Sequence, residues 1–316
     1  MRIVYCAFAA GVSLNTAFGC DLCSTYAASQ ARGEYGQGFF SGVAEQFTHF
    51  GTVQVDGNEV ANPADQYLDS SISQVFAGYN LTKRWGVQFN MPVIYRNFRR
   101  PDGYGGIQTG TESGLGDASL LGTFVAYRKL SEDYTITWDL LGGVKFPTGN
   151  SDRLKEEFTE LPNPVGPPSG IHGHDLALGS GSYDGLLGSS FYGRLHREFF
   201  TANLQYAIRS EGDFTYRYAN DLTWSVAPGY YFIMDDDCTL GLQGLATGEY
   251  KGTDTFQGAS AEDTGLTALY LGPQLSFTWS DWLSAQLAME LPIVMDNTAL
   301  QTVADYRIIA ALTLRF

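Results

Sequence analysis

The sequence predicts an all-β protein, a transmembrane antiparallel up-and-down β-barrel of about 12 strands with long extracellular loops and short periplasmic turns. Three observations support this fold class. Segments with alternating apolar and polar residues recur along the chain. Of the 316 residues, 14 % are aromatic and only 17 % charged, whereas soluble proteins carry about a quarter charged residues. Short polar turns and longer loops join the segments in alternation, as in outer-membrane barrels.

The C-terminal segment shows the alternation most clearly. Every second residue from Tyr306 to Phe316 is apolar, and the positions between them include Arg307 and Arg315, with Asp305 just before. Because strand side chains alternate between faces, this segment has one apolar and one polar face. Ten or so alternating residues are enough to cross a bilayer at a tilt. The terminal Phe316 matches the aromatic end of outer-membrane barrels, and we expect it to be the signal that their assembly machinery reads.

Residues 1–19 are expected to be a secretory signal peptide. Arg2 gives the positive start, residues 3–14 are mostly apolar, and Ala17-Phe18-Gly19 is a small-x-small cleavage site. The apolar run is too short to cross a bilayer as a helix. A lipoprotein signal also cleaves before a Cys such as Cys20, but Ala17 stands where Leu is usual. Export combined with amphipathic strands predicts the outer membrane of a Gram-negative cell as the location.

Residues 20–37 are expected to form an N-terminal periplasmic segment before the barrel, which would span 38–316. Cys20 and Cys23 form a C-x-x-C pair, for which a disulfide is the expected state in an oxidising periplasm. No His follows Cys23, as haem attachment would require, and no second C-x-x-C completes a zinc site. A metal or redox role of the pair and a bond from one of them to Cys238 are alternatives.

Six strands are expected in the first half of the barrel, over residues 39–54, 68–79, 85–98, 117–129, 134–146 and 183–195. The alternation of the first is weak because Glu45 and Phe47 would share a face, and that of the second is blurred. The third is clear, since Trp85 to Tyr95 place an apolar residue outward at every second position. A Gly-rich loop is expected over 100–114, and the longest loop over 147–181.

Six further strands are expected over residues 199–209, 218–232, 239–250, 266–279, 283–295 and 303–316. The eleventh would place Met295 outward. Polar turns such as 235–238 and 280–281 fit the periplasmic side. A soluble two-sheet sandwich is the rival fold, but its strands would be nearer five or six residues. Aromatic residues near the strand ends fit the two interfacial girdles of a membrane barrel: Trp85, Tyr95, Tyr134, Phe146, Tyr230, Phe232, Phe277 and Trp279.

The inward-facing polar residues are the candidate solute path. Their charges are mixed, so they either pair across strands and plug the lumen or line an open pathway; a narrow lined channel satisfies both. Twelve strands leave more interior room than eight, where side chains just fill the barrel. The set comprises Gln88, Asn90, Arg96, Asp139, Lys145, Arg194, Asn203, Gln205, Arg209, Asp221, Gln243, Glu249, Gln274, Gln286, Glu290, Asp305 and Arg307.

Other chemistry is weakly indicated. His172, His174 and Asp175 are weak candidates for a metal site, since two imidazoles and a carboxylate suit zinc or copper, but a solvated loop is the expected state and no cofactor is expected. The same histidines with Ser180 or Ser182 lack a G-x-S-x-G frame, so no catalytic residue is assigned and enzyme activity is not expected. The net charge of −15 argues against nucleic acid as a partner.

Four stretches recur in an order that resembles the phenol-degradation meta-pathway transporter-like family of outer-membrane barrels. They are Tyr79–Trp85 running to Met91–Val93, Gly114–Asp117, Gly143–Gly149 and Gly179–Asp184. The resemblance covers the chain from about Tyr79 to the C-terminus. It implies a barrel that passes small compounds, aromatic or apolar ones included, and it carries no catalytic residues. The Cys20-x-x-Cys23 segment is not part of the pattern.

The sequence therefore supports two functions. The first is passive or facilitated passage of a small-molecule solute through an outer-membrane barrel, in contact with membrane lipid and lipopolysaccharide. The second is a structural or partner-docking barrel, whose N-terminal C-x-x-C segment engages a periplasmic redox or metal protein.

Overall fold

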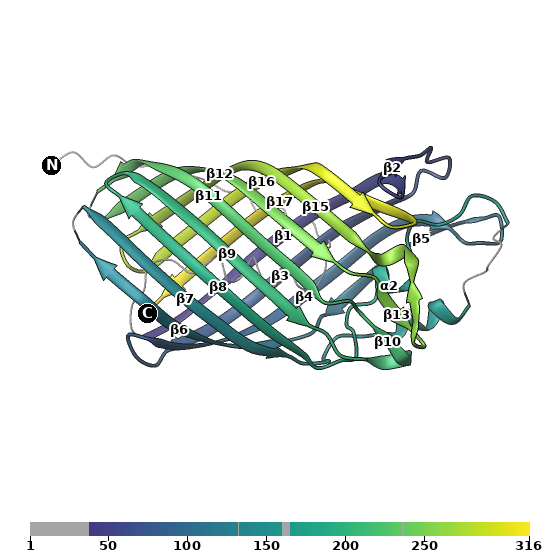
Figure 1. The fold of residues 1–316 in the computed structure, drawn as a ribbon, viewed down its shortest axis with the longest axis horizontal. Coiled ribbons are helices and arrows are strands. Elements are labelled where there is room, and N and C mark those ends of the chain that lie inside the picture. Colours follow the sequence, from purple (N-terminus) through teal and green to yellow (C-terminus); the bar gives the residue numbers. More distant parts are fainter. Residues whose placement is uncertain (1–37, 132, 160–164, 236) are drawn as a thin grey trace.

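The computed structural model describes residues 38–131, 133–159, 165–235 and 237–316 as a closed antiparallel barrel of twelve strands (Figure 1). The predicted signal peptide and the C-x-x-C segment lie outside the described residues. The wall strands are β1 (Gly38–Val55), β3 (Tyr67–Asn80), β4 (Trp85–Pro101), β6 (Ser119–Leu130), β7 (Tyr134–Lys145), β8 (Asp184–Leu195), β9 (Glu198–Ile208), β11 (Asp221–Met234), β12 (Cys238–Lys251), β15 (Leu266–Trp279), β16 (Leu283–Asn297) and β17 (Leu300–Arg315).

The first and last strands close the barrel. Each wall strand pairs with its predecessor and its successor along the chain, and β17 pairs with β1 from Arg315 opposite Phe40 to Leu300 opposite Val55. Closure leaves no edge strand, which is what a membrane requires, because unpaired backbone groups cannot be hydrated in lipid. The predicted all-β, up-and-down barrel is confirmed.

One predicted loop is wrong. The stretch expected as a Gly-rich loop over 100–114 contains strand β5 (Ile107–Leu115), which pairs with the extended upper part of β4. The lower part of β4 pairs with β6, so β5 and β6 continue one another along the same edge. Gly110 permits this pairing: a Cβ there would lie only 2.8 Å from the ring of Phe98. The glycine marks close packing within a strand, not a flexible loop.

Shorter elements gather at one end of the barrel, at the right of Figure 1. The chain termini of the barrel and the short turns lie at the other end. In outer-membrane barrels the connections are short turns on the periplasmic side and longer loops on the extracellular side. The end that carries the short helices and strands of the longer loops is therefore extracellular. None of the described helices is long and apolar enough to span a membrane. The short helices and strands at the extracellular end are β2 (Asn58–Glu59), η1 (Asp152–Phe158), α2 (Gly173–Leu176), η2 (Asp213–Thr215), β10 (Tyr216–Arg217), β13 (Asp254–Phe256), β14 (Ala259–Ala261) and η3 (Glu262–Thr264).

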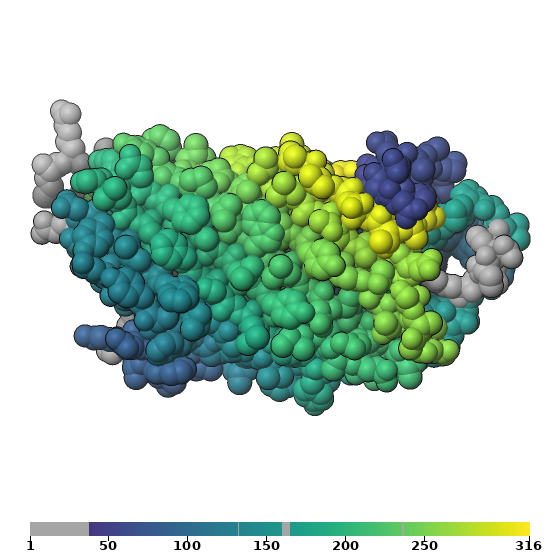
Figure 2. Space-filling model, in the orientation of Figure 1, coloured from purple at the N-terminus to yellow at the C-terminus, as the bar shows by residue number. Residues whose placement is uncertain are grey.

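The distribution of side chains is inverted relative to a soluble protein. Large apolar residues such as Val75, Leu204 and Leu287 are about half exposed on the outer surface, whereas most buried polar residues face the lumen. Figure 2 shows the outer side chains as a continuous wall over the face of the barrel that is in view. A surface of this kind is stable only when lipid covers it.

A β-bulge in β16 reverses one predicted orientation. The pairing with β15 jumps from Val294 to Pro292, so Ile293 is an extra residue on that strand. Beyond the bulge the alternation is shifted by one residue, and the prediction that Met295 faces outward is wrong. Met295 instead packs against the buried cluster that contains Tyr270.

Candidate functional site

The predicted lumen residues, with the single exception of Asp305, lie on inward-facing positions of their strands. Most are buried, and Arg194, Asn203 and Gln286 are half-buried. Arg194 lies near the periplasmic mouth, where its guanidinium donates to the carbonyl of His196 at 2.9 Å. Four of the charged members, Lys145, Arg209, Asp221 and Glu249, lie at or near the extracellular ends of their strands.

Asp305 was predicted to face the lumen, and that prediction is wrong. The pairing of β17 with β1 jumps from Tyr306 to Ala304, which makes Asp305 the extra residue of a bulge. Its carboxylate lies on the outer surface, 3.7 Å from Nε2 of His49, and Nδ1 of the same ring lies 2.6 Å from Asp69. Asp305 is therefore no part of a solute path through the lumen.

Glu45 and Phe47 share the outer face, which explains the weak alternation of β1. The carboxylate of Glu45 accepts hydrogen bonds from the hydroxyls of Ser71 and Ser73 on the neighbouring strand β3. These bonds satisfy some of the carboxylate's hydrogen-bonding capacity on a surface where water is scarce.

The longest loop folds into the barrel. Ile171, Leu176 and Leu178 of this loop pack in one buried cluster against inward-facing side chains of β3 and β4. The amide of Thr302 on β17 donates to the carbonyl of Gly170 at 2.8 Å. This bond fixes the loop to β17, which lies beside β1 on the side away from β3. The wall residues that receive the loop are Leu68, Ile72, Ile94 and Phe98.

This inward fold was missed by the sequence analysis. The available signal is the inner face of β3 and β4, which carries four large apolar residues where a water-filled lumen would favour polar ones. Apolar side chains on the inner face of a barrel need a covering partner, because their burial is the dominant stabilising term. The apolar residues at positions 171, 176 and 178 of the loop are the matching partner.

Three of the sequence motifs meet in one buried network of charges below the loop. Nζ of Lys145 lies 2.6 Å from the carboxylate of Asp117 and 2.9 Å from that of Asp184. Arg209 joins Asp184 at 3.0 Å to Asp221 at 2.8 Å. All of these side chains are almost fully buried, so each charge depends on its partners.

The remaining motif residues tie the loop to this network. Ser180 donates through its amide and its hydroxyl to Asp117, and the amide of Gly149 donates to the other oxygen of the same carboxylate at 2.9 Å. Thr148 bridges the carbonyl of Gly116 and the amide of Ala118. The Gly114–Asp117, Gly143–Gly149 and Gly179–Asp184 motifs therefore hold both ends of the inward-folded loop.

His174 sits at the centre of the folded loop. Its Nδ1 lies 3.0 Å from Glu157 and its Nε2 lies 3.5 Å from Asp175, while the hydroxyl of Tyr218 donates to its carbonyl oxygen at 3.0 Å. Burial alone would lower the pKa of His174, but the charges of Asp175 and Glu157 outweigh it and raise the pKa to about 10. The ring is a hydrogen-bonded cation that joins η1 to α2.

This geometry does not favour the metal site. Both ring nitrogens of His174 are directed at carboxylates, and a protonated imidazole has no lone pair for a metal ion. Within the described residues, no group of three or more metal-ligating side chains is arranged to hold a metal ion. Ser180 and Ser182 lie in the network around Asp117, apart from the Glu157–His174 pair, and the contacts described give no Ser–His pair for hydrolysis.

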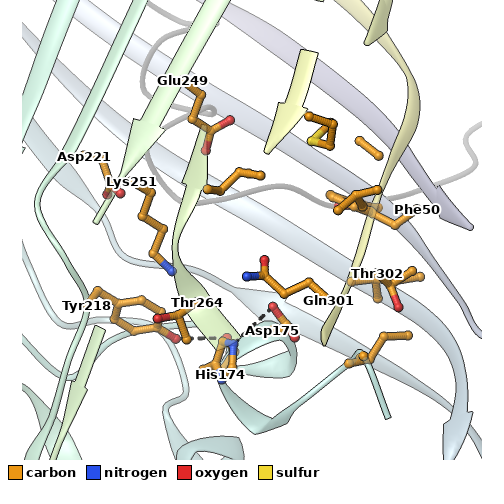
Figure 3. Close-up of a pocket in the computed structure, with 18 of the residues that line it drawn as sticks. Phe50, His174, Asp175, Tyr218, Asp221, Glu249, Lys251, Thr264, Gln301 and Thr302 are labelled. Atoms are coloured by element: carbon orange, nitrogen blue, oxygen red, sulfur yellow. Dashed lines mark hydrogen bonds and ion pairs between the residues drawn. The ribbon is translucent and has the colours of Figure 1, made fainter. Parts of the chain in front are cut away.

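A chamber of about 150 Å³ lies between α2 and the barrel wall. Figure 3 shows Asp221, Glu249 and Lys251 on one side of it and Phe50 on the other. Its charged residues are paired in part: Arg307 binds Glu249 at 2.9 Å. The apolar side of the chamber is lined by Phe50, Leu68, Ile171, Leu266, Tyr270, Met295, Val303 and Ala304.

Another extracellular segment packs against the inward-folded loop, because Tyr216 shares a buried cluster with Leu154 and Ala177. β10 pairs with β13, and β13 with β14, in a small separate sheet. Tyr216 is fully buried there and donates to Asp254 at 2.7 Å, and Lys251 lies 3.0 Å from the same carboxylate. The sheet is thereby linked to the wall strand β12, which carries Lys251.

Comparison with known proteins identifies the fold but no family. The sequence matches no known family and no curated protein. Among solved structures, the crystal structure of an outer membrane channel from Pseudomonas putida F1 has a TM-score of 0.61 at 15 % identity, over 90 % of this chain and 97 % of that chain. This likeness shows that the chain has the fold of an outer-membrane β-barrel.

Two further solved structures are less similar. The translocator domain of the autotransporter NalP from Neisseria meningitidis has a TM-score of 0.43 at 9 % identity, over 94 % of this chain and 95 % of that chain. The CymD monoaromatic hydrocarbon channel has a TM-score of 0.38 at 8 % identity, over 96 % and 95 %. The resemblance to the phenol-degradation family stays a prediction.

Proposed function

We propose that this protein is an outer-membrane channel through which small solutes pass without energy coupling. The observation that carries the proposal is the chamber beneath the inward-folded loop, because a barrel that served only as a structural element would need no lined space in its lumen. One solved structure with this fold is described as an outer membrane channel, which agrees with this function.

The chamber suggests the size and chemistry of the solute. A cavity of about 150 Å³ is large enough to hold a benzene-sized ring. One side offers apolar and aromatic surface and the other offers paired charges around Glu249 and Lys251. A small amphiphilic compound, with a ring or short aliphatic body and one polar substituent, satisfies both sides. Such a solute also agrees with the resemblance to the phenol-degradation family.

Selection would rest on the width of the passage and on the lumen charges, as in other passive pores. The proposed path includes the inward-facing set, and Arg96, Arg209 and Arg307 of this set line the chamber. Because Arg96 donates to the carbonyl of Asp175 on the loop, movement of the loop and access to the path are linked.

The channel function can be tested by filling the chamber. Ala304 is buried and lines it, whereas Ala310 lies on the outward face of the same strand. Ala304→Trp should reduce single-channel conductance in planar bilayers and uptake of phenol-sized solutes into liposomes several-fold. Ala310→Trp is the matched control and should leave both unchanged. A wild-type protein that neither conducts nor admits solutes would refute the proposal.

Several contacts with the cell envelope belong to the proposal. Membrane lipid and lipopolysaccharide would surround the apolar outer wall, and the assembly machinery would read Phe316. The ring of this residue is exposed at the C-terminus and packs against Phe39 with centroids 5.7 Å apart. No enzyme activity or cofactor is proposed.

The partner-docking alternative depends on Cys20 and Cys23, which lie outside the described residues. The two functions separate experimentally. Changing both cysteines to Ser should leave conductance intact under the channel function. Under the docking function, the same change should abolish recovery of a defined periplasmic redox or metal protein.

A further inference from the structure

A row of four polar side chains crosses the inner wall of the barrel beside the chamber. Arg96 of β4 lies opposite Ser70 of β3, and Ser70 lies opposite Thr48 of β1. Thr48 in turn lies opposite Arg307 of β17. Side chains of directly opposite residues project from the same face of a sheet, and here that face is the lumen. All four residues are buried, and all except Thr48 line the chamber.

The two hydroxyls in the middle of this row lack a hydrogen-bond partner among the residues that the structure describes. Neither Ser70 Oγ nor Thr48 Oγ1 makes a hydrogen bond with the described part of the chain, and both side chains are fully buried. A buried hydroxyl without a partner is destabilising, and each hydroxyl can donate one hydrogen bond. The centre of the row therefore offers two donors to an acceptor that enters the chamber.

The two ends of the row are arginines held in place by other contacts. Arg307 binds Glu249 at 2.9 Å, and its guanidinium carbon lies 3.8 Å from the centroid of the Tyr270 ring. Arg96 donates to the carbonyl oxygen of Asp175 on the inward-folded loop, which is an uncharged acceptor. Because both guanidinium groups are already positioned, little conformational entropy is lost when an anion binds between them.

Acidic residues continue the row beyond both arginines. Glu112 of β5 lies opposite Arg96, and Glu290 of β16 lies opposite Arg307. The carboxylate of Glu112 also binds Arg153. An anion over the two central hydroxyls would have the arginines one strand away on either side and these acids one strand further. Since the Coulomb energy falls with distance, the nearer arginines dominate and the centre of the row favours a negative charge.

An apolar row borders the polar row on its extracellular side. Leu68 of β3 lies opposite Phe50 of β1, and Phe50 lies opposite Ala304 of β17. All three residues line the chamber, and Phe50 marks this side of it in Figure 3. On β1 and β3 the two rows are two residues apart, which is about 7 Å along a strand. An aromatic ring with one attached carboxylate has a comparable length.

We propose that the chamber binds the anion of an aromatic carboxylic acid. The carboxylate would lie over Ser70 and Thr48, between Arg96 and Arg307, and the ring would lie against Phe50. Guanidinium groups and hydroxyls both form strong hydrogen bonds to a carboxylate. The inference rests on the proposed channel function, because it names the chemical class of the solute that passes.

The test compares three solutes that share one ring and differ in charge: benzoate, benzyl alcohol and benzylamine. Block of the single-channel KCl current is measured in planar bilayers. Benzoate should block at about ten-fold lower concentration than the other two, as expected for hydrogen bonds to a charged group. Arg96→Gln should remove most of this difference. Ser70→Ala/Thr48→Val should reduce it several-fold without changing the charge of the site.

Two controls remove the same types of group elsewhere. Arg99 lies on the same strand as Arg96 but projects from the outer face, where it donates to the carbonyl of Ala64 at 2.9 Å. Thr223 is a buried, inward-facing residue of β11 that does not line the chamber. Arg99→Gln and Thr223→Val should therefore leave the preference for benzoate unchanged.

The outcomes separate this inference from the channel function. Equal block by the three solutes, or an unchanged preference in a folded Arg96→Gln variant, would overturn the anion site. Broadening of the ¹⁹F signal of 4-fluorobenzoate by the purified barrel measures binding without conduction. A barrel that binds this probe but does not conduct would refute the channel and retain the site. Heat-modifiable migration shows that each variant is folded, and Ser70→Ala/Thr48→Val provides the test if Arg96→Gln is not.

Discussion

Weakening the apolar anchor of the inward-folded loop should open the barrel. Ile171 and Leu176 are fully buried against the wall in the cluster that contains Phe98. Truncating a buried Ile or Leu to Ala costs about 2–5 kcal/mol. The two side chains share one cluster, so their effects add incompletely. A loss of about 3 kcal/mol in the free energy of loop docking for Ile171→Ala/Leu176→Ala would lower the ratio of docked to released loop more than a hundred-fold.

Single-channel recording measures this change directly. The double variant should show a higher conductance level, or occupy its open level for a larger fraction of time, than the wild type. Leu287→Ala/Ile308→Ala removes side chains of the same type from the outer wall, where both are exposed, and should leave the conductance unchanged. Unchanged conductance of a folded Ile171→Ala/Leu176→Ala variant would refute the prediction that the inward-folded loop obstructs the lumen.

Four further predictions follow from the same structure. Lys145→Met would leave Asp117 and Asp184 facing one another without their shared cation and should cost about 3–5 kcal/mol, seen as a lower urea midpoint of unfolding; a midpoint equal to that of the wild type would contradict the role of the network. Because the pKa of His174 is raised from 6.5 to about 10, its contribution to loop docking is complete below pH 6.5 and is lost as the pH rises towards 10. Open probability should rise over that interval in the wild type and stay flat in His174→Gln, and equal pH dependence in both would exclude His174 as the cause. A charged thiol reagent should block conductance through Arg307→Cys but not through Asp305→Cys, since the bulge places Asp305 on the outer wall; block of both would contradict the bulge. Deletion of Phe316 should reduce the amount of heat-modifiable, membrane-inserted protein, and normal amounts would show that the terminal ring is dispensable for assembly.

The strands were predictable because their signal is local. A wall strand has one face in lipid and one in the lumen, so alternation such as that from Trp85 to Tyr95 records both orientations within a few residues. The structure places the corresponding strand at Trp85–Pro101 and the tenth at Leu266–Trp279, the latter with the predicted bounds. The first strand gave a weak signal for a physical reason: Glu45 faces outward, where its serine partners on β3 compensate its polarity.

The bulges were not predictable from alternation. One inserted residue shifts the period of a strand by half, so that every later side chain changes face. In β17 the shift places Asp305 outside while Arg307 stays inside, and in β16 it turns Met295 inward. Nothing in the local composition marks these points, because a bulge depends on the register of two strands and not on one.

The sequence by itself determined the barrel, its strand order, and most of the residues that face the lumen, because each of these depends on the two-residue period of a strand. The motif residues Asp117, Lys145 and Asp184 could be identified in the sequence, but the contacts between them could not be predicted from it. The tertiary structure decided that these residues form one charged network, that the loop around His174 folds into the barrel, and that a chamber is left beside Tyr270. These features join residues far apart in the chain, and their stability comes from burial and ion pairing across the lumen, which only the closed barrel brings within reach.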